Sequence, residues 1–296
     1  MKFQEYKIEC DCKNIYYFLK DMGFAENFIC NLRKEWGNLV VNDQIVNIRQ
    51  PLRKGDILKI NNNPNQKTTI MHCRIPLNVV YEDDYYLLIN KPSGLPCMPS
   101  RSHYTSNLAG AICNYMKKED GFVLRIINRL DKDTAGIIIV AKDSISQNKI
   151  KDIEKRYVAI CEGEILKPLS INSPIKTINN NGVNEHKRIV SPDGKPATTF
   201  ITPIASENKH SLLSIKLLHG RTHQIRVHLS SIGNPLLGDE LYGKKSTLLN
   251  HTALICKEIS FYHPYLQKTL SFQIDYPQDF EKAMTILGLK QKTHIK

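Results

Sequence analysis

One polar segment divides this sequence more clearly than any other feature. Residues 61–69, NNNPNQKTT, contain Pro64 and no apolar side chain that recurs at helix or strand spacing. Such a stretch cannot form part of a core, so the chain is expected to fold as two domains on either side of it. With 296 residues, the chain is long enough for both. The expected division is a small domain at 1–62, a linker at 63–74, a large domain at 75–288 and a tail at 289–296.

The segment before the linker predicts a small α+β domain. Apolar residues recur at helical spacing from Ile15 to Met22, and a second helix is predicted over 25–36. The run NLVVNDQIV predicts a hairpin that turns at Asn42 and Asp43, and ILKI predicts a last strand. Cations at the end of the second helix and in the later loops are candidate phosphate contacts: Arg33, Lys34, Arg49, Arg53 and Lys54.

Beyond the linker, the sequence consists mainly of β-prone runs. They are VVYEDD, YYLLINK, GIIIVAK, residues 157–161, residues 213–217, HTALICKEISFYHP and TLSFQIDYP. An amphipathic stretch with Leu108, Ile112 and Met116 predicts a helix among them. The pattern indicates an α+β domain in which helices pack on a long mixed sheet.

The composition excludes several classes of protein. No apolar run approaches the roughly 20 residues that a membrane span needs, and the start, MKFQEYKIEC, does not resemble a secretory signal, so a cytoplasmic protein is expected. The eight cysteines never form a C-x-x-C pair, which favours free thiols over a zinc knuckle or a disulfide framework. There are 41 Lys and Arg against 29 Asp and Glu, and this formal charge of +12 is compatible with a polyanionic partner without identifying one.

Two segments place charged residues next to apolar strands. NRLDKDTAG, at 128–136, precedes the apolar run 137–141, where a loop can hold a carboxylate at the mouth of a cleft. The same spacing also fits a solvated turn in which Asp131 or Asp133 caps a backbone amide. Lys155, Arg156 and Tyr157 open another strand, and they fit either base stacking beside phosphates or an ordinary core tyrosine.

A third segment, GRTHQIRVHL at 220–229, is predicted to begin a helix with Thr222 as its N-cap. The neighbouring His219, His223 and His228 suggest a zinc-dependent hydrolase as one hypothesis. A helical zinc site of that kind needs two His four residues apart with a Glu base between them, and this spacing does not supply it. Histidines that are hydrogen-bonded or face RNA are therefore expected, with no metal.

These segments, in this order, resemble the motifs of the RluA family of pseudouridine synthases. INRLDKDTAGIIIVAK resembles that family's H-R-L-D-x-x-T-S-G motif and the strand after it, and YEDDYYLLINKPSGLPCMPS resembles its motif with K-P-x-G. KRYVAICEG is similar to its tyrosine motif, and GRTHQIRVHLSSIGNPLLGDELYG to its arginine motif. VVNDQIV and LRKGDILKI are similar to the S4-type RNA-binding domain that often precedes this catalytic domain.

The resemblance implies a pseudouridine synthase fold with a long mixed, largely antiparallel sheet flanked by helices, plus an S4-like N-terminal domain. It implies isomerisation of uridine in structured RNA, in large-subunit rRNA first and tRNA second, by a monomer that needs no cofactor, metal or membrane. Asp131 would be the catalytic aspartate, Arg226 its paired cation and Tyr157 the tyrosine that stacks on the base. Further RNA contacts would be Arg129, Asn128, Arg221, His223 and Lys155, with Arg129 filling the gap left by the flipped uridine, and the apolar walls would be Leu130, Ile225 and Leu229.

These residue types suit the reaction. A buried aspartate tends to become neutral, and a nearby guanidinium favours its charged form and fixes its orientation. Extruding a uridine costs a few kcal/mol, which stacking on Tyr157 can offset by about 1–3 kcal/mol. The sequence does not decide whether Asp131 adds covalently or acts as a base.

Two positions depart from the family pattern. Asn128 stands where His is usual, and Ala135 stands where Ser is usual. Asn can donate and accept hydrogen bonds but cannot titrate. These positions support the alternative hypothesis of an inactive RNA-binding or ribosome-assembly factor on the same fold, whereas Asp131, Tyr157 and Arg226 favour the enzyme.

Overall fold

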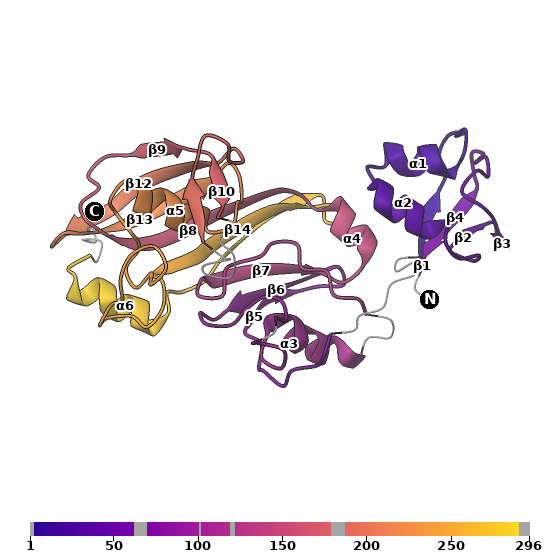
Figure 1. Ribbon diagram of the computed structural model, residues 1–296. Coiled ribbons are helices and arrows are strands. Elements are labelled where there is room, and N and C mark those ends of the chain that lie inside the picture. The colour runs from indigo at the N-terminus through magenta and orange to yellow at the C-terminus, as the bar shows by residue number, and fades with distance from the viewer. Residues whose placement is uncertain (1–2, 62–69, 101, 119–121, 179–186, 290–296) are drawn as a thin grey trace, which may run out of the picture.

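The structure is a computed structural model that describes residues 3–61, 70–100, 102–118, 122–178 and 187–289 (Figure 1). Most of the expected linker and nearly all of the expected tail, 290–296, lie outside these ranges. Residues 3–61 form a four-stranded sheet with two helices, called here the N-terminal module, and the chain from 79 onward forms a nine-stranded sheet.

The N-terminal module is an antiparallel sheet in the order β1-β4-β2-β3. Its elements are β1 (Phe3–Lys7), α1 (Ile15–Asp21), α2 (Glu26–Leu32), β2 (Leu39–Val41), β3 (Gln44–Ile45) and β4 (Ile57–Asn61). The expected hairpin turn is present, and Asn42 and Asp43 both adopt the left-handed conformation that such tight turns need, with φ of 48° and 64°.

The second helix is shorter than predicted. It ends at Leu32 instead of Trp36, so Arg33 and Lys34 follow the helix and do not lie within it. The side-chain amide of Asn38 donates to the carbonyl of Leu32 at 3.2 Å and satisfies the end of the helix. The chain then turns away and leaves Trp36 72% exposed, so the apolar character of Trp36 did not mark a buried helix face.

Helix α4 (Ser144–Lys149) of the larger unit packs on the N-terminal module. Ile145 is fully buried in the same apolar cluster as the module's core. The ammonium of Lys149 lies 5.0 Å from the ring centre of Tyr6 and 5.9 Å from that of Phe24. The hydroxyl of Tyr265 also donates to the Gln4 side chain at 3.4 Å, so this face of the larger unit is covered by the module.

The larger unit is built on a sheet with strand order β5-β6-β7-β14-β8-β13-β12-β9, and β15 pairs with β14. Its strands are β5 (Val79–Glu82), β6 (Tyr86–Lys91), β7 (Ala135–Ala141), β8 (Lys151–Glu162), β9 (Leu169–Asn172), β12 (Thr198–Glu207), β13 (His210–Leu217), β14 (Leu254–His263) and β15 (Lys268–Gln273). All pairings are antiparallel except β7 with β14. The prediction of a mixed, largely antiparallel sheet flanked by helices is confirmed, while β9, β12, α4 and α6 (Gln278–Ile286) were not predicted.

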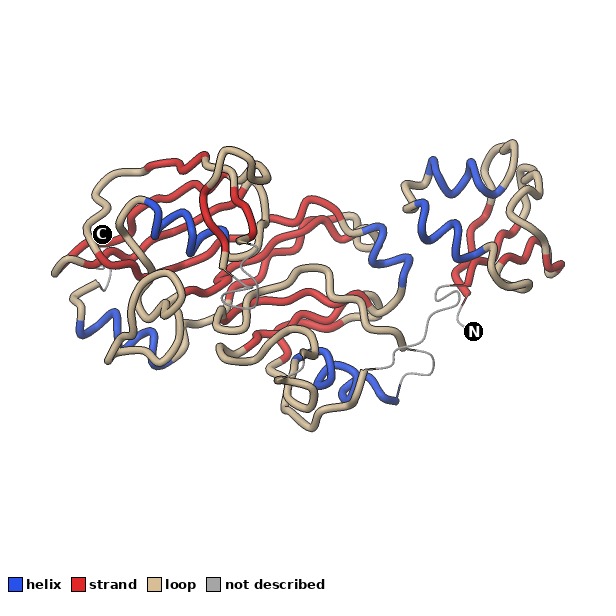
Figure 2. The backbone as a smooth tube through the Cα atoms, in the orientation of Figure 1, coloured by secondary structure: helices blue, strands red, loops and turns tan. Residues whose placement is uncertain are grey.

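Helices cover both faces of the sheet (Figure 2). Alternate residues of β6 and β7 belong to opposite clusters: Leu87 and Ile138 face α3 (Leu108–Tyr115) and α5 (Gln224–Ser231), and Leu88 and Ile139 face α6. A short hairpin of β10 (Ile175–Thr177) and β11 (Arg188–Val190) lies against α5. Both faces of the central strands are therefore largely buried.

All eight cysteines are free. Among the described residues, no helix has the length and apolar character needed to cross a membrane.

Candidate active site

The loop that carries Asp131 is held against the most buried strand of the sheet. β7 follows it and is buried at every position. Gly136 has φ of +125°, and a Cβ at this position would collide with the backbone of Cys256 in β14. Glycine is therefore required where β7 and β14 begin to pair, and this close pairing fixes the end of the loop.

Asn128 anchors the other end of this loop. Its amide nitrogen donates to the carbonyl of Ile137 at 3.0 Å, and its amide oxygen accepts the N–H of Ile139 at 2.7 Å. The residue is 6% exposed. Both hydrogen-bonding groups of the side chain therefore serve the backbone of β7, and an RNA contact at Asn128 stays a prediction. Ala135 is buried at the start of β7 and packs in the core.

A buried lysine clamps the loop from a second segment. The Lys91 ammonium donates to the carbonyls of Pro92, Leu95 and Lys132 at 2.8–2.9 Å, and the Ser93 hydroxyl donates to the carbonyl of Asp133. Burial lowers the pKa of Lys91 to about 8. This lysine was expected only as part of the K-P-x-G motif, and its contact with the loop that carries Asp131 was not predicted.

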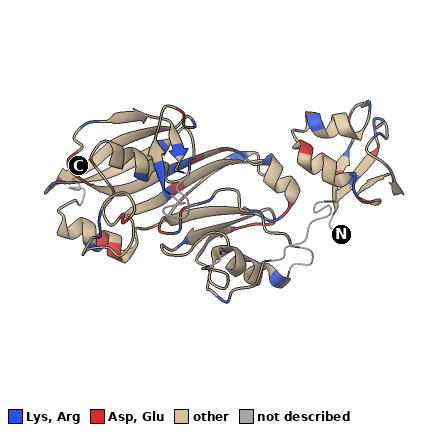
Figure 3. Cartoon of the chain, in the orientation of Figure 1, with Lys and Arg blue, Asp and Glu red and all other residues tan. Residues whose placement is uncertain are grey.

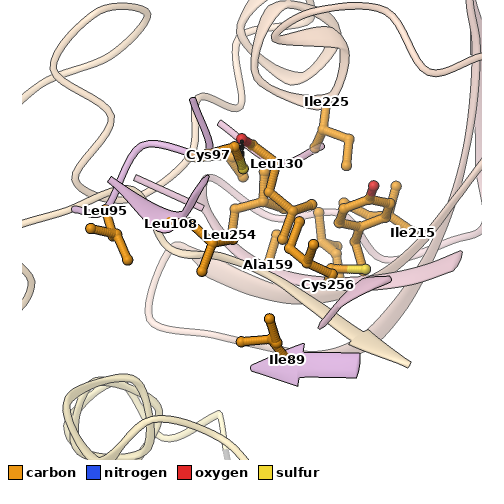
Figure 4. Packing of buried hydrophobic residues seen from close by; sticks show 14 of the residues in the cluster. Ile89, Leu95, Cys97, Leu108, Leu130, Ala159, Ile215, Ile225, Leu254 and Cys256 are labelled. Carbon is orange, nitrogen blue, oxygen red and sulfur yellow. Dashed lines mark hydrogen bonds between the residues drawn. The ribbon is translucent and has the colours of Figure 1, made fainter. Parts of the chain in front are cut away.

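One cavity of about 560 Å³ collects the expected residues of the larger unit from distant parts of the chain. Its lining includes all eight: Asn128, Arg129, Asp131, Lys155, Tyr157, Arg221, His223 and Arg226. Two of the three expected apolar walls, Leu130 and Ile225, also line it, with Cys97 and Leu254 (Figure 4). Leu229 is fully buried in the cluster behind them and is not part of the lining.

Arg226 is paired first with a residue that the sequence analysis missed. Its Nε and Nη2 donate to the two carboxylate oxygens of Asp239 at 2.7 and 2.8 Å, while Nη1 lies 3.6 Å from Asp131 Oδ2. The expected pairing of Arg226 with Asp131 is therefore an ion pair without a hydrogen bond. Burial disfavours the charge of Arg226, but the hydrogen bonds to Asp239 together with the negative charges of Asp239 and Asp131 raise its pKa. The GDELYG stretch contains the overlooked residue.

Asp239 holds Arg226 in a fixed orientation. Its carboxylate is fully buried and also accepts the backbone N–H groups of Leu241 and Tyr242, both at 3.1 Å. The ring of Tyr242 lies 5.1 Å from the guanidinium carbon of Arg226. The guanidinium thus has little freedom, and one of its nitrogens is directed toward Asp131.

His223 approaches Asp131 from the N-terminus of α5. It occupies the N-cap position that was predicted for Thr222, with a left-handed φ of 57° and without a capping bond from its side chain. The side chain instead contacts the Tyr242 hydroxyl through Nδ1 at 2.9 Å, and Nε2 lies 3.9 Å from Asp131 Oδ2. A carboxylate opposite Nε2 favours the tautomer with its proton on Nε2, so we assign Tyr242 as the donor to Nδ1.

Asp131 itself remains open to a ligand. Its side chain is 25% exposed, and among the described residues it accepts no hydrogen bond. Arg226 Nη1 lies 3.6 Å and His223 Nε2 lies 3.9 Å from the carboxylate oxygen Oδ2, and both distances are too long for a hydrogen bond. The carboxylate can therefore meet a substrate atom while its charge is balanced by Arg226.

Tyr157 forms the apolar side of the cavity. It is 6% exposed, and burial, followed by the proximity of Cys256 and Asp131, raises its pKa well above the ordinary value of 10. The phenol is therefore neutral at physiological pH. A neutral aromatic ring beside a carboxylate suits a flat, uncharged base.

The remaining expected contacts, Arg129, Arg221 and Lys155, line the same cavity, and Figure 3 shows how Lys and Arg are distributed along the chain. Arg129 and Arg221 are exposed, and Lys155 is half-buried. Arg221 donates from Nε to the carbonyl of Pro196 at 3.0 Å, which leaves its outer nitrogens toward solvent. These cations are placed to contact phosphates around the mouth.

The histidines do not form a metal cluster. His228 is fully buried and contacts Thr199 Oγ1 and the carbonyl of Ser173, both at 2.8 Å. The Nδ1 of His219 is buried without a hydrogen-bond partner in the described chain, so for His219 the expectation of a histidine that is hydrogen-bonded or faces RNA stays a prediction. No group of three metal-ligating side chains is found among the residues that the structure describes.

The N-terminal cations are exposed and lie in two places. Arg33 and Arg49 line one shallow groove. Arg53 and Lys54 lie in the turn before β4, and Lys34 follows α2. The residues that line the cavity around Asp131 include none of these five.

Comparisons with known proteins show which family this chain is similar to. The model of a family described as RNA pseudouridylate synthase matches residues 85–231. A Bacillus subtilis (strain 168) protein named as an uncharacterized RNA pseudouridine synthase, YjbO, is 31% identical over 273 residues, which covers 89% of this chain and 95% of that protein. Ribosomal large subunit pseudouridine synthase D of Zymomonas mobilis is 33% identical over 240 residues, or 74% of this chain and 75% of that protein.

The solved structure of human RNA Pseudouridylate Synthase Domain Containing 4 has the same fold, with a TM-score of 0.58 at 22% identity over 72% of this chain and 94% of that chain. Fold, cavity and sequence together define an RNA-modifying isomerase. The chain belongs to the RNA pseudouridine synthases and, with relatives of the large-subunit type, to the RluA family, as its motifs predicted.

Proposed function

We propose that this protein isomerises uridine to pseudouridine within structured RNA and that Asp131 is its catalytic residue. The observation that carries this proposal is the environment of the Asp131 carboxylate. It lies 3.6 Å from Arg226 Nη1, accepts no hydrogen bond from the described residues and shares one cavity with the buried ring of Tyr157. An accessible anion beside an apolar slot is what a reaction at the sugar of a stacked base requires.

The reaction breaks the bond between N1 of uracil and C1′ of ribose and forms one between C5 and C1′. C5 loses a proton, N1 gains one, and no cofactor or redox change is needed. The uridine has to leave its helix to reach the cavity, at a cost of a few kcal/mol. Tyr157 stacks on the extruded base, and Arg129, exposed at the rim, occupies the vacated position. Asp131 either adds to the sugar or base or removes a proton from the ribose.

We propose large-subunit rRNA as the substrate, with tRNA second. Relatives from Zymomonas mobilis, Buchnera aphidicola and Haemophilus influenzae are named ribosomal large subunit pseudouridine synthase D, at 31–33% identity. We further propose that the protein acts as a monomer in the cytoplasm, where this RNA is made and folded.

We also propose that residues 1–62 are an S4-like RNA-binding domain and that 75–288 are the catalytic domain. The separate sheet of the N-terminal module and its exposed cations, Arg33, Lys34, Arg53 and Lys54, support this division. Cations of this kind contact phosphates and position a protein on RNA without carrying out chemistry.

The test is to map pseudouridine in total RNA from a strain that lacks the gene, after incubation with the purified protein and no added metal. New pseudouridines in large-subunit rRNA are expected with the wild-type protein. None is expected with Asp131→Asn, while Asp133→Asn, with the same charge change in the same loop, should produce the wild-type pattern. New sites confined to tRNA would reject the proposed substrate, and no new site in any RNA would reject the proposed activity.

A further inference from the structure

The N-terminal module has a groove that the catalytic proposal does not use. It has a volume of about 380 Å³ and lies between the segment after α2 and the loop before residue 50. Its floor consists of the buried side chains of Leu32, Leu39 and Ile48. Trp36 lines the groove and is 72% exposed.

The exposure of Trp36 follows from how α2 ends. Asn38 satisfies the last turn of the helix, and Gly37 adopts φ of 100°, which other residues rarely adopt. The chain therefore turns out of the helix and places the indole on the surface. Trp36 is the only tryptophan in the protein. A large aromatic surface left in contact with water at a groove is typical of a binding site.

Two arginine side chains line the same groove as this indole. Arg33 and Arg49 both line the groove, both are exposed, and neither forms a salt bridge with the described residues. Glu26, which interacts with Arg33 at longer range, is itself bound to Lys20 at 2.6 Å. Glu35 adds one carboxylate to the lining, so the side chains of the groove carry a net charge of +1.

We propose that this groove binds one unpaired nucleotide of the RNA, with its base stacked on Trp36 and its phosphates on Arg33 and Arg49. The inference rests on the proposed function, because it assigns a second contact to the same RNA. Aromatic rings and guanidinium groups together are typical of single-strand recognition. The groove volume of about 380 Å³ lies near the lower limit of small-ligand sites, which is about 300 Å³. This size favours a single nucleotide over a protein surface. Glu35 can accept a hydrogen bond from an exocyclic amino group of the base.

The unique tryptophan allows a direct test in the full-length protein. Its fluorescence is followed during titration with a single-stranded oligo(A) octamer, which contains no uridine and is not a substrate. An octamer with the same sugars and phosphates but no bases is the matched probe. We expect saturable quenching by oligo(A) and much weaker quenching by the abasic octamer, because only a base can stack on the indole.

Variants then separate stacking from charge. Trp36→Ala should weaken binding of labelled oligo(A) by about 5- to 150-fold, and Trp36→Phe should restore most of it. Arg33→Gln and Arg49→Gln should each reduce the slope of log affinity against log salt by about 0.7. Trp36 is mostly exposed, so none of these variants removes a core side chain.

Equal quenching by the two octamers, or unchanged affinity in Trp36→Ala, would overturn the proposal. Quenching by RNA-free ribosomal proteins but by neither octamer would assign the groove to a protein partner and would also overturn it. The proposed activity is measured separately, by tritium release from C5-tritiated RNA. If tritium is released and oligo(A) does not quench, the groove assignment alone fails. If oligo(A) quenches and no RNA is isomerised, the proposed function fails and the groove assignment stands as a property of the module.

Discussion

Asp239→Asn should damage both stability and catalysis, although Asp239 lies behind Arg226 and outside the lining of the main cavity. The carboxylate accepts four hydrogen bonds, two from Arg226 and one each from the backbones of Leu241 and Tyr242. An amide in its place keeps one oxygen but turns its NH₂ group toward an N–H of Arg226. One charge-assisted hydrogen bond is lost, and the buried guanidinium of Arg226 loses the negative charge of its closest partner.

The expected magnitude follows from this burial. Removing one partner of a buried ion pair costs about 3–5 kcal/mol. Asp131, 3.6 Å from Arg226 Nη1, still balances part of the charge, so the lower end of about 3 kcal/mol is expected. At about 2–4 °C per kcal/mol for a protein of this size, the melting temperature should fall by about 6–12 °C. A displaced Arg226 should also lower single-turnover isomerisation by about 100-fold.

Glu240→Gln is the matched control. It makes the same change of charge at the next residue, where the carboxylate is 61% exposed and lies 3.7 Å from Lys245. Thermal unfolding and tritium release from C5-tritiated RNA should both remain close to wild type in this variant, because exposed ion pairs contribute little. If Asp239→Asn also melts within about 1 °C of wild type and retains full activity, the argument that Asp239 positions Arg226 is refuted.

Three further predictions follow from neighbouring contacts. Arg226→Lys should lower the single-turnover rate by at least about 10-fold, because an ammonium cannot form the two-point contact with Asp239. Tritium release at the wild-type rate by this variant would show that the two-point contact is not required. Burial lowers the pKa of His223 from 6.5 in the folded protein, so its contribution to stability is complete above pH 6.5 and is lost as the pH falls through the folded-state pKa. Urea unfolding between about pH 7.5 and 5 should show that His223→Asn loses less unfolding free energy with acid than the wild type does. Equal losses in the two proteins would contradict this. A chain that starts at residue 70 should keep Asp131-dependent turnover at saturating RNA. It should lose about 1.5–3 kcal/mol of unfolding free energy, because Ile145 becomes exposed. An unchanged unfolding midpoint would show that the module does not cover Ile145.

The sequence predicted the parts of the fold whose pattern is local. β7 is a continuous apolar run, β14 combines apolar and β-prone residues over ten positions, and the Asn42-Asp43 turn has a residue preference of its own. The hairpin β10–β11 was missed because its strands are only three residues long. Helix α6 was also missed, although Phe280, Ala283 and Met284 have helical spacing and are buried on the sheet.

The prediction of the site was similarly divided. Motif resemblance identified residues that the fold brings into one cavity, although local spacing alone could not connect Asp131 with Arg226. Asp239 was overlooked because it follows Arg226 by 13 residues and meets it only through the tertiary fold. Asn128 was expected at the RNA because it stands at the motif position where His is usual, and the structure uses both ends of its amide inside the protein. Sequence therefore indicated the chemistry more readily than the supporting contacts.

The central claim is that the Asp131 carboxylate carries out the isomerisation, and the most direct measurement is single-turnover tritium release from C5-tritiated RNA by Asp131→Asn and Asp133→Asn. The Asp131 carboxylate is partly exposed and forms no hydrogen bond with the described residues, so its replacement should leave the melting temperature and RNA affinity near wild type. The account predicts no detectable release by Asp131→Asn and wild-type release by Asp133→Asn. Release by Asp131→Asn at a rate close to that of the wild-type protein would contradict it.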